Sequence, residues 1–307
     1  MIILKIRGGI GNQMFQYAFG KSISRKFRTD VILDLEALFN QAPRVGAMPR
    51  TYGLNIFSIR PKFTLLSKVG LFINRTDSKL VKFLFKTKEV LKTMIRPIYE
   101  RKVITEEEFH SDANLTQKTI EGSCFSGYWQ NEKYFKDIKD EIKKDFSFKN
   151  SVSEKFVPIL KAIKDSASVC IHVRRGDNVL NPISSKVFGY LEIDYYKKAF
   201  SMMEGLVPNA KFFIFSDDIA WCIENFKFIP DVVFVSDKNN EADPSDDMQL
   251  MSNCSHFIIS NSTLSWWVAY LGKNPAKIVI TPKNWFKDKA MNKNYKDNLL
   301  LPEWKPI

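Results

Sequence analysis

The chain has 307 residues, of which 45% are hydrophobic, and only 13 are glycine and 13 proline. This composition is typical of ordered globular proteins and excludes disordered and fibrous classes. The formal net charge of +12 and a pI of about 9.3 favour an anionic partner, such as nucleic acid, an anionic lipid surface or a phosphorylated small molecule. The length allows two domains of roughly 150 residues each.

The first elements predict a β-α-β unit. Residues 2–6 form a β-branched apolar run that ends in glycines and indicates a buried strand. A helical pattern follows over 13–27, and residues 31–34 indicate a second strand. Such an opening is typical of a parallel sheet with crossover helices.

The loop between the first strand and the first helix is rich in glycine. Gly8, Gly9 and Gly11 let the backbone approach a ligand closely, and the helix start favours anions or oxygens. Gly9 and Gly11 match part of the dinucleotide-binding fingerprint, and Asp34 lies at a suitable distance along the chain. Because Met14 stands at the third glycine position, a nicotinamide-dependent oxidoreductase is the alternative hypothesis rather than the leading one.

Most of the net positive charge comes from residues 60–102, where twelve Lys and Arg residues outnumber three acidic ones and are interleaved with apolar residues. The pattern indicates basic amphipathic helices, either with a solvated face or lying on an anionic membrane. We do not expect nucleic acid as a partner. The N-terminal apolar run is too short for a signal peptide, and no window is long enough for a membrane-spanning helix. We therefore expect a cytoplasmic protein, with peripheral contact to the inner face of the plasma membrane as an option.

After an amphipathic helix predicted over 132–146, a second β-α series predicts a domain boundary near residue 150. We expect strands at 169–173, 211–215, 232–235, 257–259 and 277–280, the last of these being the final strand, and helices at 194–203, 247–254 and 264–271. The fold class is therefore α/β, with domains 1–150 and 151–307. Ligands of such sheets bind beyond the carboxyl ends of the strands, and a cleft between the domains is the simplest architecture. The four cysteines are widely spaced, which predicts buried reduced thiols.

The most polar strand end is His172-Val173-Arg174-Arg175-Gly176-Asp177. Arginine binds phosphate oxygens bidentately and stays charged, so Arg174 and Arg175 suit a diphosphate leaving group. Asp177 could hold an arginine in place, bind an acceptor or act as a base. The alternative is an ion-pair cluster that orders a surface loop.

A second polar cluster follows the strand at 257–259. Asn261, Ser262 and Thr263 precede a helix, where hydroxyl and N–H groups can cradle phosphate or merely cap the helix. Trp266 and Trp267 are expected in the core. The chain has no Asp-x-Asp and only three scattered histidines, so we expect no metal site and no cofactor.

Taken together, these segments resemble the bacterial α-1,2-fucosyltransferases of glycosyltransferase family 11. The resemblance rests on 9–18, 172–177, 260–267 with 269–271, and 282–285, in this order and over nearly the whole chain. It implies two Rossmann-like domains facing a cleft in a GT-B-type fold, GDP-β-L-fucose as donor, inversion and no metal. It also implies a terminal galactoside as acceptor, with α-1,6 or similar linkages as alternatives. A basic module that binds anionic surfaces, resting on 60–102, is a third and non-catalytic hypothesis.

The resemblance also implies roles for individual residues. Arg174 and Arg175 would bind the β-phosphate and the leaving oxygen. The remaining residues implied at the donor are His172 and Asp247 at guanine, Ser262 and Thr263 at the phosphates, and Asp217 and Asn261 nearby. Gly11, Asn12 and Gln13 would reach fucose or the acceptor from the first domain. Related α-1,6 enzymes have a glutamate base where this chain has Pro182, so Asp177 is the candidate base, with Glu192, Asp194 and Asp217 as alternatives.

Overall fold

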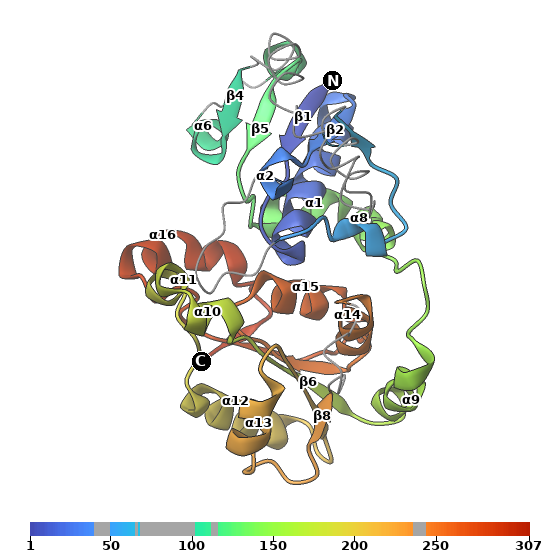
Figure 1. Cartoon of the computed structure of the whole chain (residues 1–307), viewed down its shortest axis with the longest axis vertical. Helices are drawn as coiled ribbons and strands as arrows, with labels where there is room; N and C mark the ends of the chain where they lie inside the picture. The colour runs from blue at the N-terminus through green and yellow to red at the C-terminus, as the bar shows by residue number, and fades with distance from the viewer. Residues whose placement is uncertain (40–49, 65–66, 68–101, 112–115, 236–243) are drawn as a thin grey trace, which may run out of the picture. The chain divides into compact units, whose positions relative to one another are not determined.

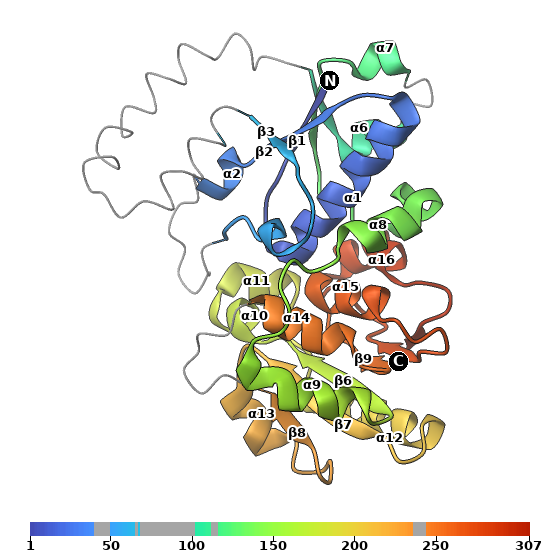
Figure 2. The same ribbon diagram turned by 90° about the vertical axis from the view of Figure 1, so that its right-hand side faces the viewer.

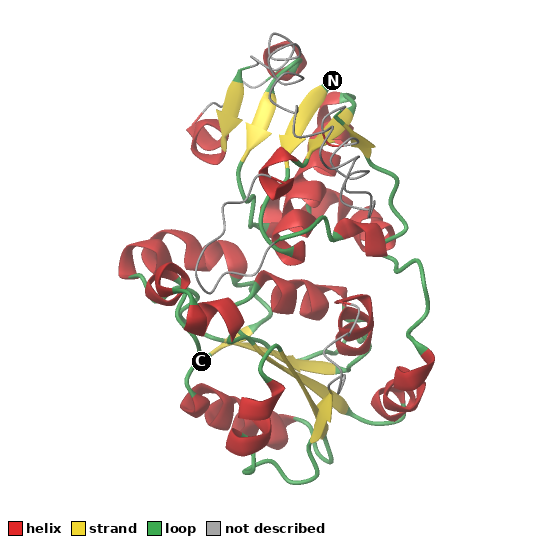
Figure 3. Cartoon of the chain, viewed as in Figure 1, coloured by secondary structure: helices red, strands yellow, loops and turns green. Residues whose placement is uncertain are grey.

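A computed structural model describes residues 1–39, 50–64, 67, 102–111, 116–235 and 244–307. These residues form two compact units, and the first ends at Phe146, close to the boundary predicted at residue 150. Both units contain strands and helices (Figure 3). Most of the basic region 60–102 lies outside the described residues, so its predicted helices and membrane contact stay predictions.

The first unit contains a five-stranded parallel sheet in the order β3-β2-β1-β5-β4. Its strands are β1 (Ile2–Lys5), β2 (Val31–Asp34), β3 (Lys62–Phe63), β4 (Val103–Thr105) and β5 (Cys124–Ser126). The pairing of Ile2 with Val31 confirms the predicted β-α-β opening. Strands β3, β4 and β5 were not predicted, because two or three residues are too few for a recognisable pattern. The helical prediction for 60–102 is wrong at its start, where β3 pairs with β2.

The helices of the first unit begin with α1 (Ile10–Phe27), which starts directly after Gly9 and three residues earlier than predicted. The others are α2 (Glu36–Phe39), η1 (Leu54–Ile56), α6 (Glu106–Ser111), α7 (Gln117–Ile120), η3 (Glu132–Tyr134), η4 (Lys136–Ile138) and α8 (Lys139–Asp145). The single helix predicted over 132–146 is therefore wrong. Phe135 leaves the helical conformation at φ −138° and is buried, so the chain turns there to place its ring in the core.

The second unit contains a six-stranded parallel sheet in the order β11-β10-β9-β6-β7-β8. Its strands are β6 (Ser168–Val173), β7 (Lys211–Ser216), β8 (Val233–Val235), β9 (His256–Ile258), β10 (Val279–Thr281) and β11 (Lys305–Pro306). The prediction that the strand at 277–280 is the last one is wrong. Because Ile280 pairs with Lys305, β11 adds a further strand at the edge.

Helices cover both faces of this second sheet. They are η5 (Glu154–Phe156), α9 (Val157–Lys164), α10 (Gly176–Leu180), α11 (Pro182–Val187), α12 (Ile193–Leu206), α13 (Ile219–Asn225), α14 (Pro244–Ser252), α15 (Thr263–Leu271) and α16 (Lys289–Leu299). Helices α12 and α13 lie on one face and α14 and α15 on the other (Figures 1 and 2). Val169, Ile171 and Val173 of β6 pack with α12 in the core, so the intervening His172 points to the opposite face, toward α15.

All four cysteines are free and buried, which confirms the predicted buried thiols. Among the described residues, no helix is both long and apolar enough to pass through a membrane.

Candidate functional site

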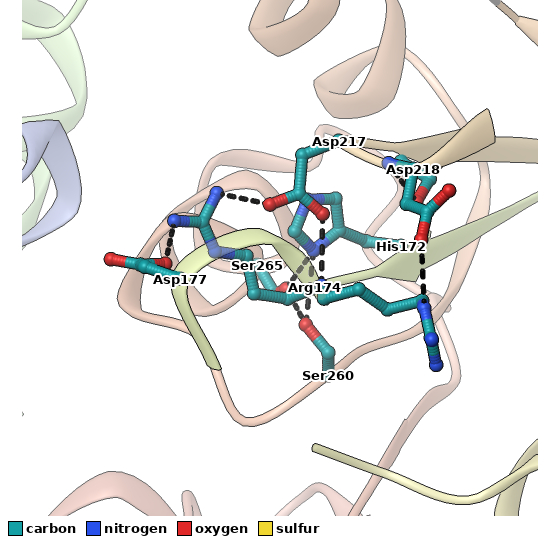
Figure 4. A network of polar contacts seen from close by, with 9 residues as sticks. His172, Arg174, Asp177, Asp217, Asp218, Ser260 and Ser265 are labelled. Atoms are coloured by element: carbon teal, nitrogen blue, oxygen red, sulfur yellow. Dashed lines mark hydrogen bonds and ion pairs between the residues drawn. The ribbon is translucent and has the colours of Figure 1, made fainter. Parts of the chain in front are cut away.

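The carboxyl end of β6 carries the predicted motif, and β7 lies beside it. Val173 pairs with Ser216 in parallel register, so the residues that follow the two strands emerge together. Arg174 thereby meets Asp217, as Figure 4 shows, and Arg175 meets Asp218. The sequence placed both polar segments at strand ends, and the register of the sheet joins them in one site.

Arg174 lies between two carboxylates. Its Nη1 is 2.7 Å from Asp217 Oδ2, and its Nη2 forms an ion pair with Asp177 Oδ1. Both ends of the guanidinium are therefore held, and the three side chains are mostly buried. Asp177 points toward Arg174 (Figure 4), so the structure gives this aspartate the arginine-holding position that the sequence offered as one option.

Arg175 is held differently, by one carboxylate and two aromatic rings. Its Nε donates to Asp218 Oδ2 at 3.0 Å, and its Cζ lies 3.9 Å from the centroid of the Trp221 ring. The Tyr190 ring lies on the guanidinium at 5.4 Å, and the side chain is only 14% exposed. Its two Nη atoms make no hydrogen bond to any residue that the structure describes. Arg175 therefore keeps a bidentate donor edge for a ligand.

Asp218, Trp221 and Tyr190 were missed as site residues. Asp218 caps α13 by accepting a hydrogen bond from the Trp221 N–H at 3.3 Å, which brings carboxylate and indole to the same side of the helix start. An aspartate at a strand end followed three residues later by tryptophan was the available signal. It is weak, because capping alone explains the aspartate.

Gly176 allows the close approach of the two strand ends. A Cβ at this position would lie 2.3 Å from Asp217 Oδ2, which is far inside van der Waals contact. The Asp217 carboxylate uses the space to accept a hydrogen bond from the Arg175 N–H at 2.8 Å. Asp217 thus ties both arginines to β7, which is a positioning role.

His172 is buried beneath the arginines. Its Nδ1 lies 3.0 Å from Ser260 Oγ and also contacts Ser265 Oγ, and the two hydroxyls are 2.8 Å apart. Burial, followed by the nearby charge of Arg174, lowers the pKa of His172 to about 3. The imidazole is therefore neutral at physiological pH and supplies hydrogen bonds rather than positive charge.

The loop before α15 contains the predicted hydroxyl cluster. Ser262 is the N-cap residue of α15, yet its side chain makes no capping hydrogen bond, so capping does not explain its hydroxyl. Thr263 begins the helix, and both side chains are partly exposed. Asn261 has a structural position, because its amide donates to the carbonyls of Phe188 at 3.0 Å and Trp285 at 3.2 Å. Trp266 and Trp267 are fully buried, which confirms their expected place in the core.

Asp247 lies in the first turn of α14 and is partly exposed. Its charge contributes, after burial and Cys254, to the raised pKa of the Cys170 thiol on β6. Asp247 is therefore on the face of the sheet that also carries His172. The neighbouring Asp246 is structural, because it accepts hydrogen bonds from the N–H and the hydroxyl of Ser153.

The predicted contacts in the first unit divide into two kinds. Gln13 is fully buried, and its amide donates to the carbonyls of Gly8 and Thr51 at 2.9 and 2.8 Å and accepts from the Gly53 N–H. Its side chain therefore joins two loops, and the predicted ligand contact does not fit it. Asn12 is partly exposed at the start of α1, next to the buried Gly11. These two keep their predicted location beyond the end of β1.

The remaining candidate carboxylates are Asp34, which the oxidoreductase hypothesis requires, and the alternative bases Glu192 and Asp194. Asp34 is buried and accepts hydrogen bonds from the Glu36 N–H and Ser67 Oγ, and burial raises its pKa. It is therefore not placed to bind a ribose as the oxidoreductase hypothesis requires. Glu192 and Asp194 are exposed at the start of α12. No group of three His, Cys, Asp or Glu side chains that could hold a metal ion occurs in the part of the chain that the structure describes.

Comparison with known proteins gives consistent matches. A sequence model of glycosyl transferase family 11 matches residues 1–307. An alpha-1,2-colitosyltransferase of Escherichia coli is 31% identical over 95% of this chain and 94% of its own length. The O-antigen biosynthesis glycosyltransferase WbnK of Escherichia coli is 30% identical over 97% of this chain and 98% of its own. The galactoside alpha-(1,2)-fucosyltransferase 2 of Mus musculus is 29% identical over 60% of this chain and 54% of its own.

Among solved structures, the fucosyltransferase NodZ from Bradyrhizobium is similar, with a TM-score of 0.48 and 14% identity over 91% of this chain and 94% of that chain.

Proposed function

Because the chain belongs to glycosyl transferase family 11, we propose that it transfers L-fucose from GDP-β-L-fucose to the 2-hydroxyl of a terminal galactoside. The names of two relatives, an alpha-1,2-colitosyltransferase and a galactoside alpha-(1,2)-fucosyltransferase, support the linkage and the class of acceptor. The donor assignment rests on the guanidinium of Arg175 at the carboxyl end of β6. Asp218 and Trp221 hold this group in place, and its two Nη atoms make no hydrogen bond to another described residue.

On the donor side, Arg175 offers its Nη edge to the β-phosphate. Leaving-group charge develops on this phosphate as the glycosidic bond breaks, and preorganised donors stabilise it most effectively. Ser262, Thr263 and the free N–H groups of the first turn of α15 bind the other phosphate oxygens. The neutral His172 and the carboxylate of Asp247 serve guanine, because a carboxylate can accept from its N1–H and N2–H together.

An inverting transfer needs one base on the acceptor side. Asp177 remains the candidate, and its ion pair with Arg174 must loosen before its carboxylate can accept the proton of the acceptor hydroxyl. Asp217, Glu192 and Asp194 are the alternatives, but Asp217 is already bound to both arginines. No metal and no cofactor enter this scheme, since the arginines and the N–H groups supply the leaving-group stabilisation.

The second candidate differs only in the donor sugar. The 31% identity to a colitosyltransferase makes colitose, a fucose that lacks the 3-hydroxyl, the alternative donor sugar. Purified enzyme is assayed with GDP-fucose and with GDP-colitose against a panel of β-galactosides, and the linkage of the product is determined by NMR. Transfer of fucose to the 2-hydroxyl is expected. Preference for GDP-colitose would show that colitose, not fucose, is the donor sugar. A product with another linkage would show that the acceptor hydroxyl is not the 2-hydroxyl, and consumption of neither donor would refute the proposal.

A further inference from the structure

A loop at the carboxyl end of β5 brings an exposed aromatic ring next to a cation. Arg7 and Tyr128 each lie three positions beyond the paired residues Leu4 of β1 and Phe125 of β5, so the parallel register places them side by side. The Arg7 Cζ lies 4.5 Å from the centroid of the Tyr128 ring. Tyr128 is nonetheless 42% exposed, and it lies beyond the carboxyl end of β5, where ligands of parallel sheets bind.

The neighbouring Trp129 explains why Tyr128 points outward. Trp129 has a left-handed backbone with φ 56°, is fully buried and stacks on Phe19 with ring centroids 3.8 Å apart. The backbone N–H of Trp129 donates to Glu106 Oε2 at 3.0 Å, and a Cβ at Gly127 would lie 2.8 Å from the indole. A tryptophan in this conformation is strained, and such strain persists only where the surroundings enforce it.

Because Trp129 points into the core, its neighbours Tyr128 and Gln130 lie beyond the carboxyl end of β5. Gln130, on the other side of Trp129, donates from Nε2 to Asn12 Oδ1 at 2.7 Å, which leaves the Asn12 NH₂ group without a hydrogen bond to another described residue. The Arg7 Nε is buried and has no hydrogen-bond partner in the described residues. A buried donor without a partner, such as this Nε, is rare and indicates that something else accepts its hydrogen bond.

We propose that Arg7, Asn12, Tyr128 and Gln130 form the subsite that binds the acceptor sugar ring. A pyranose presents apolar C–H groups to an aromatic ring and hydroxyl oxygens to amide and guanidinium donors, and this cluster offers both kinds of contact. The inference rests on the proposed glycosyl transfer, but it concerns only residues of the first unit. The donor residues described above all belong to the second unit.

The test compares Tyr128→Ala, Tyr128→Phe and Arg7→Gln with the parent enzyme, using lactose and N-acetyllactosamine as acceptor probes. Tyr128→Ala and Arg7→Gln should each raise the acceptor KM about tenfold. Tyr128→Phe keeps the ring and should stay within about twofold of the parent. The donor KM and the affinity for GDP should not change. Val103→Ala, which alters an equally exposed side chain in the same unit, serves as the matched control.

Saturation-transfer NMR with both disaccharides, in the presence of GDP, provides a readout that does not depend on turnover. An unchanged acceptor KM and unchanged saturation transfer in Tyr128→Ala would overturn the subsite. So would a parallel loss of GDP affinity, or a parent enzyme that transfers no saturation to either disaccharide. Failure of the proposed function looks different, because the parent enzyme would then consume neither sugar nucleotide with any acceptor.

Discussion

Replacing Arg175 by lysine tests whether the donor site needs the guanidinium or only a positive charge. Lysine keeps the charge but loses the Nε hydrogen bond to Asp218 and most of the stacking on Trp221. A hydrogen bond to a charged group contributes about 1.5–3 kcal/mol and a cation–π contact about 0.5–1 kcal/mol. If about 2–3 kcal/mol of this positioning energy is lost from the transition state, kcat/KM falls roughly 30- to 150-fold.

The assay measures initial rates of GDP release with saturating acceptor, together with the affinity for GDP. Arg25→Lys is the matched control, because Arg25 forms an ion pair with Glu141 on the surface of the first unit and is 62% exposed. It should retain parent activity. If Arg175→Lys keeps more than about a third of the parent kcat/KM, the bidentate role assigned to Arg175 is wrong.

Three further predictions follow from the same site. Gly176→Ala should push the Asp217 carboxylate off both arginines and lower kcat/KM about tenfold or more. The control is Gly205→Ala in α12, where a Cβ would meet open space, and this variant should retain activity and slightly raise the melting temperature. By NMR, His172 should stay neutral down to about pH 4, since its pKa is about 3. The free energy of unfolding should then fall as the pH drops from about 6.5 toward 3, by about 2 kcal/mol at pH 5, because only the unfolded chain gains the proton. A His172 that titrates near its ordinary pKa would contradict this. Transfer should also survive excess EDTA, and a loss that Mn²⁺ restores would count against metal-independent catalysis.

The strands of the site could be predicted because their residues are consistently apolar. Both β6 and β7 are buried runs bounded by polar residues, and their predicted ends agree with the structure to within one residue. Their mutual register could not be predicted, since the paired residues, such as Val173 and Ser216, are more than forty positions apart along the chain. The meeting of Arg174 with Asp217 follows from that register and from the missing side chain at Gly176.

Gln13 is a residue whose predicted ligand contact the folded structure overturns. A polar side chain after a glycine-rich loop suggested a ligand contact, and the local sequence contains nothing against it. The partners that occupy its amide, Thr51 and Gly53, are about forty residues away along the chain. Whether a polar group is free for a ligand is decided by such distant partners, so it becomes visible only in the folded unit.

The charges around the arginine pair determine how a diphosphate would bind. Arg174 and Arg175 carry two formal positive charges, and the aspartates bonded to them, at positions 177, 217 and 218, carry three negative ones. The cluster therefore offers no net positive charge to a donor. Attraction must come from directed donors instead, namely the Nη edge of Arg175 and the N–H groups at the start of α15. Direction, unlike charge, is lost when the guanidinium becomes an ammonium, so a lysine at position 175 fails although it carries the same charge.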